Sequence, residues 1–206
     1  MVEWSKEGTR SEKREALLEA AAGLLREEGI GGVSLRRVAD RAGVSTQMIY
    51  TLYGGKSGLL QALWKKGFDE LAGALEAVEA EPMEQLRELG RSYRDWALEH
   101  PALYEAMFAR SLKEFRPGGA DVERETRSFQ ILLECVERCV EEGYFGDLSP
   151  RRVADALWTA VHGSVELELS GFYEDEGEAE TQFELMLATV GQGLLKVGGG
   201  DAGESL

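Results

Sequence analysis

The sequence has few of the residues that cross-link small secreted proteins or carry out catalysis. It has two cysteines, Cys135 and Cys139, and two histidines, His100 and His162. Two cysteines do not make a disulfide framework, so we expect them to be small core residues, with a redox or metal role as the alternative. The sequence also has no glycine-rich phosphate loop, no HExxH, no nucleophile elbow and no zinc-ligand spacing. We therefore expect no enzyme, no cofactor and no bound metal.

Long apolar runs are also absent. No run approaches the roughly 18 residues that span a bilayer. The first residues, MVEWSKEGTRSEKRE, are charged and lack the apolar core of a signal peptide. We expect a cytoplasmic protein with no membrane partner. Proline is scarce, with four residues, whereas Ala, Leu and Glu are frequent, and this composition favours helices.

Positive charge is scarce and unevenly distributed. The formal net charge is −15. Residues 1–66 carry 11 Lys and Arg against 8 Asp and Glu, a net charge of +3, whereas residues 67–206 carry 12 against 30, a net charge of −18. The acidic total argues against non-specific coating of nucleic acid. The weakly basic first third indicates that the two parts of the chain have different functions.

Helical periodicity and helix-boundary residues predict an all-α fold of about nine helices, with no strands and no internal repeat. The predicted helices cover residues 10–28, 35–42, 46–53, 56–80, 82–99 and 102–110, a segment from Phe129 to Val140, a segment from Pro150 to Leu169, and a segment from Phe183 to Leu194. The segments KEFRPGGAD, GYFGDLSP and the acidic YEDEGEAET are expected to be loops.

Two of the short helices meet at Gly43 and form a candidate helix-turn-helix. On a wheel of about 100° per residue, Met48, Ile49 and Leu52 share one side of the helix that Ser45 is expected to cap. A helix this short must pack its apolar side on its neighbours. The opposite side is therefore expected to face outward, and it carries Thr46, Gln47, Tyr50 and Thr51.

These outward side chains suit the major groove of DNA. Glutamine can pair with adenine, threonine can contact thymine, and a tyrosine hydroxyl can donate to a phosphate. The helix N-termini at Ser34, Ser45 and Lys56 present N–H groups suited to phosphate oxygens, and Arg36 and Arg37 flank the groove. The alternative is an ordinary three-helix bundle with a polar face, and the wheel alone favours DNA binding only slightly.

The run ALLEAAAGLLREEGIGGVSLRRVADRAGVSTQMIYTLYGGKSGLLQALW resembles the DNA-binding domain of the TetR family of transcriptional regulators. The matching elements are an alanine-rich first helix, EEG, a Ser/Thr cap, VADRAGVS, IY, an aromatic residue before a short turn, then a lysine and a leucine pair. One departure is that Leu52-Tyr53 stand where the family usually has His and then Phe. This position is a packing or backbone-contact site.

The resemblance implies a role for each matched residue. Ser34, Tyr50 and Lys56 would contact phosphates. The base-facing side chains would be Thr46, Gln47 and Thr51. The expected organisation is a helix-turn-helix DNA-binding domain at residues 1–55, a larger helical regulatory and dimerisation domain at residues 56–197, and a disordered tail at residues 198–206.

Two segments of the second domain, HPALYEAMF and WTAVHGSVELELSG, resemble a C-terminal subtype with a Trp-x-x-x-His-Gly signature. The family fold implies a homodimer through the eighth and ninth helices and an effector cavity among helices four to eight. The candidate ligand-binding residues are mostly aromatic and suggest a largely apolar effector: Trp96, Tyr104, Met107, Phe108, Phe129, Trp158 and His162. Each of these is also typical of a core. His162 is either a pocket residue or proton switch, or a histidine paired with Glu166 or packed at the dimer interface.

The expected function is that of a dimeric repressor, released from a palindromic double-stranded DNA operator by a small, largely apolar effector. Two alternatives remain open. One is a DNA-binding regulator without a small-molecule effector. The other is a helical enzyme that uses His162 and Glu166 or the two cysteines. The sequence does not distinguish an activator from a repressor, and the resemblance favours a repressor.

Overall fold

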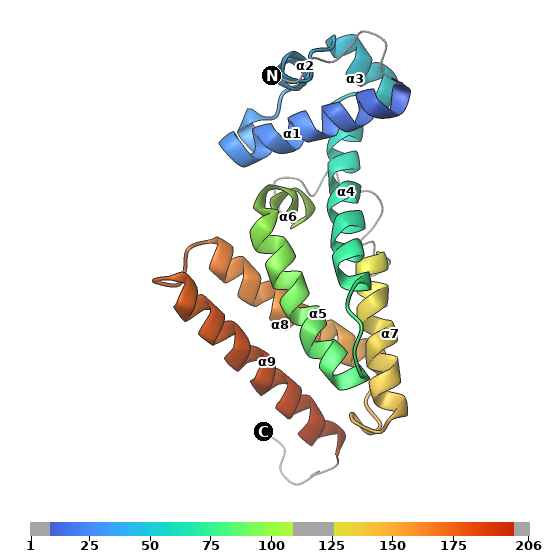
Figure 1. Cartoon of the computed structure of the whole chain (residues 1–206), viewed down its shortest axis with the longest axis vertical. Helices are drawn as coiled ribbons and strands as arrows, with labels where there is room; N and C mark the ends of the chain where they lie inside the picture. Colours follow the sequence, from blue (N-terminus) through green and yellow to red (C-terminus); the bar gives the residue numbers. More distant parts are fainter. Residues whose placement is uncertain (1–8, 109–125, 200–206) are drawn as a thin grey trace. The chain divides into compact units, whose positions relative to one another are not determined.

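The computed structural model of the chain describes residues 9–108 and 126–199. Within these residues it contains nine helices and no strand, which confirms the predicted fold class (Figure 1). The helices are α1 (Arg10–Gly32), α2 (Leu35–Ala42), α3 (Thr46–Tyr53), α4 (Lys56–Glu76), α5 (Pro82–Glu99), α6 (Pro101–Phe108), α7 (Arg127–Glu141), α8 (Pro150–Leu169) and α9 (Glu176–Gly198).

The described residues divide into two compact units. The first unit contains residues 9–68 and 100–108, and the second contains residues 69–99 and 126–199. Helix α4 contributes to both, because its residues up to Phe68 belong to the first unit and its residues from Asp69 belong to the second. No helix in the described part of the chain is long and apolar enough to cross a membrane.

The first unit begins with a capping box, as the spacing of Thr9 and Glu12 predicts. The Glu12 N–H donates to Thr9 Oγ1 at 3.2 Å, and the Thr9 N–H donates to the Glu12 carboxylate at 2.7 Å, so two helix N-terminal N–H groups are satisfied. Helix α1 is interrupted at Gly29, whose φ of 65° favours glycine. The helix therefore breaks where the sequence predicts its end, and one more turn follows to Gly32.

Helix α6 packs on α1 and α4 within the first unit. Its Tyr104 and Met107 are fully buried, and the ring of Phe108 lies 5.5 Å from that of Phe68. The absence of a side chain at Gly67 permits this packing, because a Cβ there would approach Met107 Sδ to 2.5 Å. The expected end of this helix at residue 110, and the expected loop KEFRPGGAD, lie outside the described residues.

The second unit has its core between α5, α7 and α8, with α9 lying antiparallel along α8 (Figure 1). Phe129 of α7 and Val153 of α8 are each about 1% exposed. Cys135 and Cys139 are free thiols in this core, and Cys135 Sγ donates to the carbonyl oxygen of Pro82 at 3.4 Å. Their burial confirms the expectation that they are core residues.

Two predicted boundaries are wrong. Helix α4 ends at Glu76 rather than near residue 80, and residues 77–81 form the connection to α5, which begins at Pro82. Helix α9 begins inside the segment expected to be an acidic loop. There Asp175 accepts a hydrogen bond from the Glu178 N–H at 2.9 Å, and carboxylates in the first turn are stabilised by the N-terminal end of the helix dipole. Residues 200–206 lie outside the described residues.

Candidate functional sites

The turn between α2 and α3 depends on Gly43. Its φ of 66° is left-handed, and its N–H points back to the carbonyl groups of Ala39 and Asp40, which ends α2. At the start of α2, Ser34 Oγ accepts from the Arg37 N–H at 3.4 Å. Ser45 occupies the N-cap position of α3 as predicted, but its side chain makes no capping bond and is exposed.

Helix α3 separates its apolar and polar sides as the wheel predicts. Ile49 and Leu52 are buried, with 0% and 8% exposure, and Met48 is half-buried. The side chains expected to face outward are exposed: Thr46, Gln47, Tyr50 and Thr51. The Thr51 hydroxyl donates to the Gln47 carbonyl oxygen at 2.9 Å, which leaves its methyl group and lone pairs directed outward.

The C-terminal end of α3 is fixed to α1 by Arg14 and Tyr53. The Tyr53 hydroxyl donates to the Arg14 carbonyl oxygen at 2.7 Å, and Arg14 Nη1 donates to the Leu52 carbonyl oxygen at 2.6 Å. The Arg14 guanidinium also lies over the Tyr53 ring, 4.5 Å from its centroid. Desolvation by burial raises the pKa of Tyr53. Arg14 thus serves as a positioning residue that the sequence motif does not reveal.

The arginines of α2 differ in what holds them. The Arg37 guanidinium binds the Glu28 carboxylate and donates to the Gly32 carbonyl oxygen at 3.3 Å. Arg41 binds Glu27 through two hydrogen bonds of 2.6 and 2.7 Å. By contrast, the side chain of Arg36 is 88% exposed and lies 3.8 Å from Asp40. Lys56, the first residue of α4, is also exposed.

Each of these two ion pairs lowers the pKa of its carboxylate. The hydrogen bond from Arg37 is the main reason that the pKa of Glu28 lies below its ordinary value. The hydrogen bond from Arg41 does the same for the pKa of Glu27. Both carboxylates therefore stay charged through the neutral range.

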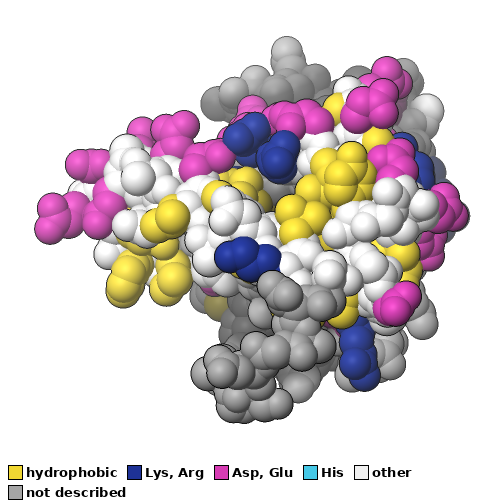
Figure 2. All heavy atoms as spheres, turned by 90° about the horizontal axis from the view of Figure 1, so that it is seen from below, with side chains coloured by type: hydrophobic (Ala, Val, Ile, Leu, Met, Phe, Trp, Pro, Cys, Tyr) yellow, Lys and Arg dark blue, Asp and Glu magenta, His cyan; other side chains and the backbone are white. Residues whose placement is uncertain are grey.

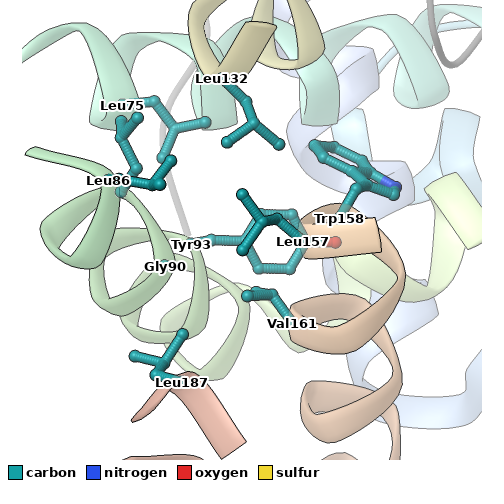
Figure 3. Close-up of a pocket in the computed structure, with 10 residues that line it drawn as sticks. Leu75, Leu86, Gly90, Tyr93, Leu132, Leu157, Trp158, Val161 and Leu187 are labelled. Carbon is teal, nitrogen blue, oxygen red and sulfur yellow. The ribbon is translucent and has the colours of Figure 1, made fainter. Parts of the chain in front are cut away.

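The second candidate site is a small cavity inside the second unit, with a volume of about 40 Å³. This volume is below the ~300–1,000 Å³ of typical ligand pockets, so binding an effector would require the lining side chains to move apart. Figure 3 shows side chains from five helices pointing toward this cavity. The lining consists of Leu75 of α4, Leu86, Leu89, Gly90 and Tyr93 of α5, Leu132 of α7, Leu157, Trp158 and Val161 of α8, and Leu187 of α9.

The cavity is almost entirely apolar. Among the lining residues, only Tyr93 and Trp158 carry a polar atom in the side chain. The Tyr93 hydroxyl lies 3.2 Å from His162 Nδ1, within hydrogen-bond distance. The Trp158 ring packs edge-on against both Tyr93 and Phe129, with centroid distances of 5.3 and 5.6 Å. The aromatic wall is thus held in place by its neighbours.

Two family models match the chain. The model for bacterial regulatory proteins of the tetR family matches residues 17–63, which include α2 and α3. The model described as tetracyclin repressor-like, C-terminal domain, matches residues 86–190, about half of the chain. The protein belongs to the TetR family. It is therefore a transcriptional regulator with a DNA-binding helix-turn-helix.

Known relatives extend the TetR match over most of the chain. The uncharacterized HTH-type transcriptional regulator YobS of Bacillus subtilis is 25% identical over 183 residues, covering 87% of this chain and 91% of YobS. The HTH-type transcriptional repressor KstR2 of Mycobacterium tuberculosis is 25% identical over 165 residues, covering 75% and 82%. A solved protein of unknown function from Rhodococcus sp. RHA1 has a TM-score of 0.73 at 25% identity, covering 95% and 98%.

The residues that the TetR resemblance predicts to bind the ligand lie in different parts of the structure. Trp158 lines the cavity, Phe129 supports Trp158, and His162 contacts Tyr93. Trp96 lines a different, more polar cleft beside α5. The remaining three lie in the first unit, on α6 itself: Tyr104, Met107 and Phe108.

Sequence reasoning missed the aliphatic part of the cavity. Leucines at helical spacing on α5 and α8 are what any helical core contains, so no signal in this one sequence distinguishes a wall of a cavity from packed interior. Gly90 offers one weak signal, because a glycine inside a helix often marks a close approach. A Cβ at Gly90 would lie 3.0 Å from a methyl group of Leu187.

Proposed function

We propose that the protein is a homodimeric repressor that binds a palindromic DNA operator through α3 and is released by a small, largely apolar effector bound in the cavity of the second unit. The observation that carries the DNA-binding part is the exposed polar face of α3 on a helix whose other side is buried and whose end is bound to Arg14. A rigid, outward-facing short helix is what reading base edges in a major groove requires.

The proposed contacts follow from position on the helices. Thr46, Gln47 and Thr51 would face bases, with Gln47 able to bind adenine through two hydrogen bonds. The groups proposed to contact phosphates surround them: Ser34, Arg36, Arg37, Ser45, Tyr50 and Lys56. Because Glu28 holds Arg37, we expect Arg37 to contact a phosphate only when this ion pair is broken, and not while it is intact.

The proposed dimer uses α8 and α9. Large hydrophobic side chains are exposed on or beside these helices, and such surfaces commonly mark protein interfaces. Their exposed fractions are 44%, 69%, 58% and 68% for Leu167, Phe172, Leu185 and Val197. Hydrophobic side chains are visible on the face shown in Figure 2, with acidic side chains at its margin. A two-fold dimer would present two copies of α3 to half-sites separated by whole turns of DNA.

The proposed route from effector to DNA is α4. This helix begins at Lys56, a proposed phosphate contact, and carries Leu75 in the wall of the cavity. An effector that favours a different position of Leu75 would shift the balance between states only by its difference in affinity for them. The similarity to the transcriptional repressor KstR2 supports a repressor rather than an activator.

The test is selection of random-sequence DNA on the purified protein, followed by binding measurements on the selected site. We expect a partial palindrome, a dimeric complex, and an affinity that falls as salt rises. Replacing Gln47 by Ala should relax sequence preference more than it lowers overall affinity. Selection without any enriched sequence would refute the proposal. A panel of small molecules that raises no melting temperature would instead favour the regulator without an effector. We also propose that the second domain belongs to the C-terminal subtype with the Trp-x-x-x-His-Gly signature, which Trp158, His162 and Gly163 form in this sequence.

A further inference from the structure

A groove on the second unit lies beside the small cavity. Its volume is about 150 Å³, and it is bordered by α5, α8, α9 and the turn that contains Phe145. Leu86, Leu157 and Leu187 line both spaces, and Figure 3 shows these three side chains from the cavity side. The rest of the groove is lined by apolar residues, one glycine and two polar residues: Met83, Phe145, Ala188, Leu195, Gly191, Arg87 and Gln192.

The groove is open to solvent on the side of its two polar side chains. The side chain of Arg87 on α5 is 56% exposed, and Gln192 on α9 is exposed. By contrast, Phe145 is fully buried and Leu157 is half-buried. The groove thus has an apolar floor and a polar mouth, so a ligand can enter it without crossing the leucines that it shares with the cavity.

The charge of the groove is opposite to that of its domain. Residues 67–206 carry 12 Lys and Arg against 30 Asp and Glu, but the groove lining contains one arginine and no carboxylate. The cleft that Trp96 lines carries four carboxylates and one arginine. At physiological salt, charges more than about 8 Å away are largely screened, so the residues at each site decide which ligand charge it favours. The groove favours an anion.

Arg87 is held more weakly than Arg91 and Arg94, the next two arginines of α5. Arg91 is bound by a carboxylate of α9 through two hydrogen bonds of 2.8 Å, and Arg94 by a carboxylate of α8 through two of 2.7 Å. For Arg87, the paired carboxylate in the described residues is Glu84 of α5 itself. Both side chains of this pair are more than half exposed, and such pairs contribute little to stability, so a ligand carboxylate can replace Glu84.

The volume and the walls of the groove limit the apolar part of its ligand. An apolar cavity of about 150 Å³ is large enough to hold one benzene molecule. Met83 and Phe145 line the groove with a thioether sulfur and an aromatic ring, and both make favourable contacts with another ring. A single aromatic ring therefore matches the groove in volume and in chemistry, and two fused rings are larger than this volume holds.

We infer that this groove is a second ligand site, which binds a small carboxylate with one aromatic ring. The ring lies between Phe145, Leu157 and Leu195. The carboxylate lies at the mouth, where it binds the Arg87 guanidinium and accepts from the Gln192 amide. Guanidinium and carboxylate match as a two-bond pair. The inference goes beyond the proposed function, because it requires neither an enlarged cavity nor a bound operator.

The first experiment measures the binding of phenylacetate, phenylacetamide and naphthylacetate to the full chain by titration calorimetry at neutral pH. Phenylacetate should bind roughly tenfold more tightly than phenylacetamide, which has nearly the same shape without the charge, because charge-assisted hydrogen bonds are about twice as strong as neutral ones. Naphthylacetate should bind roughly tenfold more weakly than phenylacetate, because its second ring does not fit the groove. Equal affinity for phenylacetate and either of the other two compounds, or no binding of phenylacetate, would overturn the inference.

Arg87→Gln tests whether the carboxylate lies at the mouth of the groove. It should lower phenylacetate affinity roughly tenfold and phenylacetamide affinity by much less, because the charged pair is lost. Arg152→Gln is the matched control, since Arg152 is exposed on α8 and lines neither the groove nor the cavity. It removes the same charge from the same domain and should bind phenylacetate as the wild type does. An equal loss of affinity in both variants would refute the role of Arg87.

Gly191→Leu tests whether the ring lies inside the groove. A Cβ at Gly191 has nothing within 4 Å, so the longer side chain can occupy the groove that this residue lines. The variant should bind both phenylacetate and phenylacetamide roughly tenfold more weakly, because the space for the ring is filled. Leucine favours helix over glycine, so the variant should fold, which its melting temperature checks. Wild-type affinity in a folded Gly191→Leu variant would refute the inference.

Gly73→Leu is the matched control for this substitution. A Cβ at Gly73 also has nothing within 4 Å, the residue is exposed on α4, and it lines neither the cavity nor the groove. We expect this variant to bind phenylacetate as the wild type does, and a loss equal to that of Gly191→Leu would refute the position of the ring. All of these measurements are made without DNA, so their failure is distinguishable from failure of the proposed release of the operator.

Discussion

Replacing Glu28 by glutamine should strengthen the dependence of DNA binding on salt. In the structure the Glu28 carboxylate holds the Arg37 guanidinium against the end of α1, where the Gly32 carbonyl oxygen also accepts from it. Glutamine has the same shape without the charge, so Arg37 gains the freedom to bind a phosphate. Each additional phosphate contact steepens the slope of log affinity against log salt by about 0.9, and a dimer makes two, so we expect about 1.8. Between 50 and 200 mM salt this corresponds to roughly twelvefold more loss of affinity.

The assay is fluorescence anisotropy on the selected operator at a series of potassium chloride concentrations. Glu27→Gln is the matched control, because it removes the same charge from the same part of α1. Its partner Arg41 should stay on α1, since its guanidinium lies against Gly23, where a Cβ would approach Arg41 Nη2 to 2.9 Å. Adding Arg37→Ala to Glu28→Gln should return the slope to its wild-type value. Equal slopes for the two glutamine variants would refute the role assigned to Arg37.

Four further outcomes are expected. Tyr50→Phe and Lys56→Ala should each weaken operator binding, and the lysine change should lower the salt slope by about 0.9 per protomer; unchanged binding would exclude both residues from the interface. Leu185→Asp places a charge on a side chain that is 58% exposed on α9, and sedimentation should show monomers in place of dimers. Tyr53→Phe should lower the free energy of unfolding of the first unit by about 1 kcal/mol, measured by denaturant titration, through loss of its bond to α1. The lowered pKa of Glu28 means that its ion pair contributes stability above the ordinary glutamate pKa and is lost as pH falls through the lowered value, so DNA affinity measured from pH 5.5 to 8 should show no step from this pair.

The sequence predicts well those parts of the fold that depend on local chemistry. The capping box at Thr9, the left-handed turn at Gly43 and the two sides of α3 are set by neighbours within a few residues, so one sequence is enough to read them. The predicted acidic loop at the start of α9 is wrong, because Asp175 caps the helix and the acidic residues after it stabilise its first turn.

The candidate sites depend on contacts between distant parts of the chain, and there the sequence says less. Tyr53 contacts Arg14, 39 positions away, and His162 contacts Tyr93, 69 positions away. No periodic pattern reports such pairs. The cavity shows the same limit, because Leu157 looks the same in a sequence whether it fills a core or borders an empty space.

The bond between Arg14 and the end of α3 has a consequence for protein engineering. Helix α3, the proposed operator-reading helix, is eight residues long, and its last turn is held by a side chain from α1. Exchanging only Thr46–Tyr53 between two regulators would keep the residues that read DNA and lose the residue that orients them. A transplant designed to move operator preference should therefore carry Arg14 together with Tyr53, so that the helix arrives with its own support.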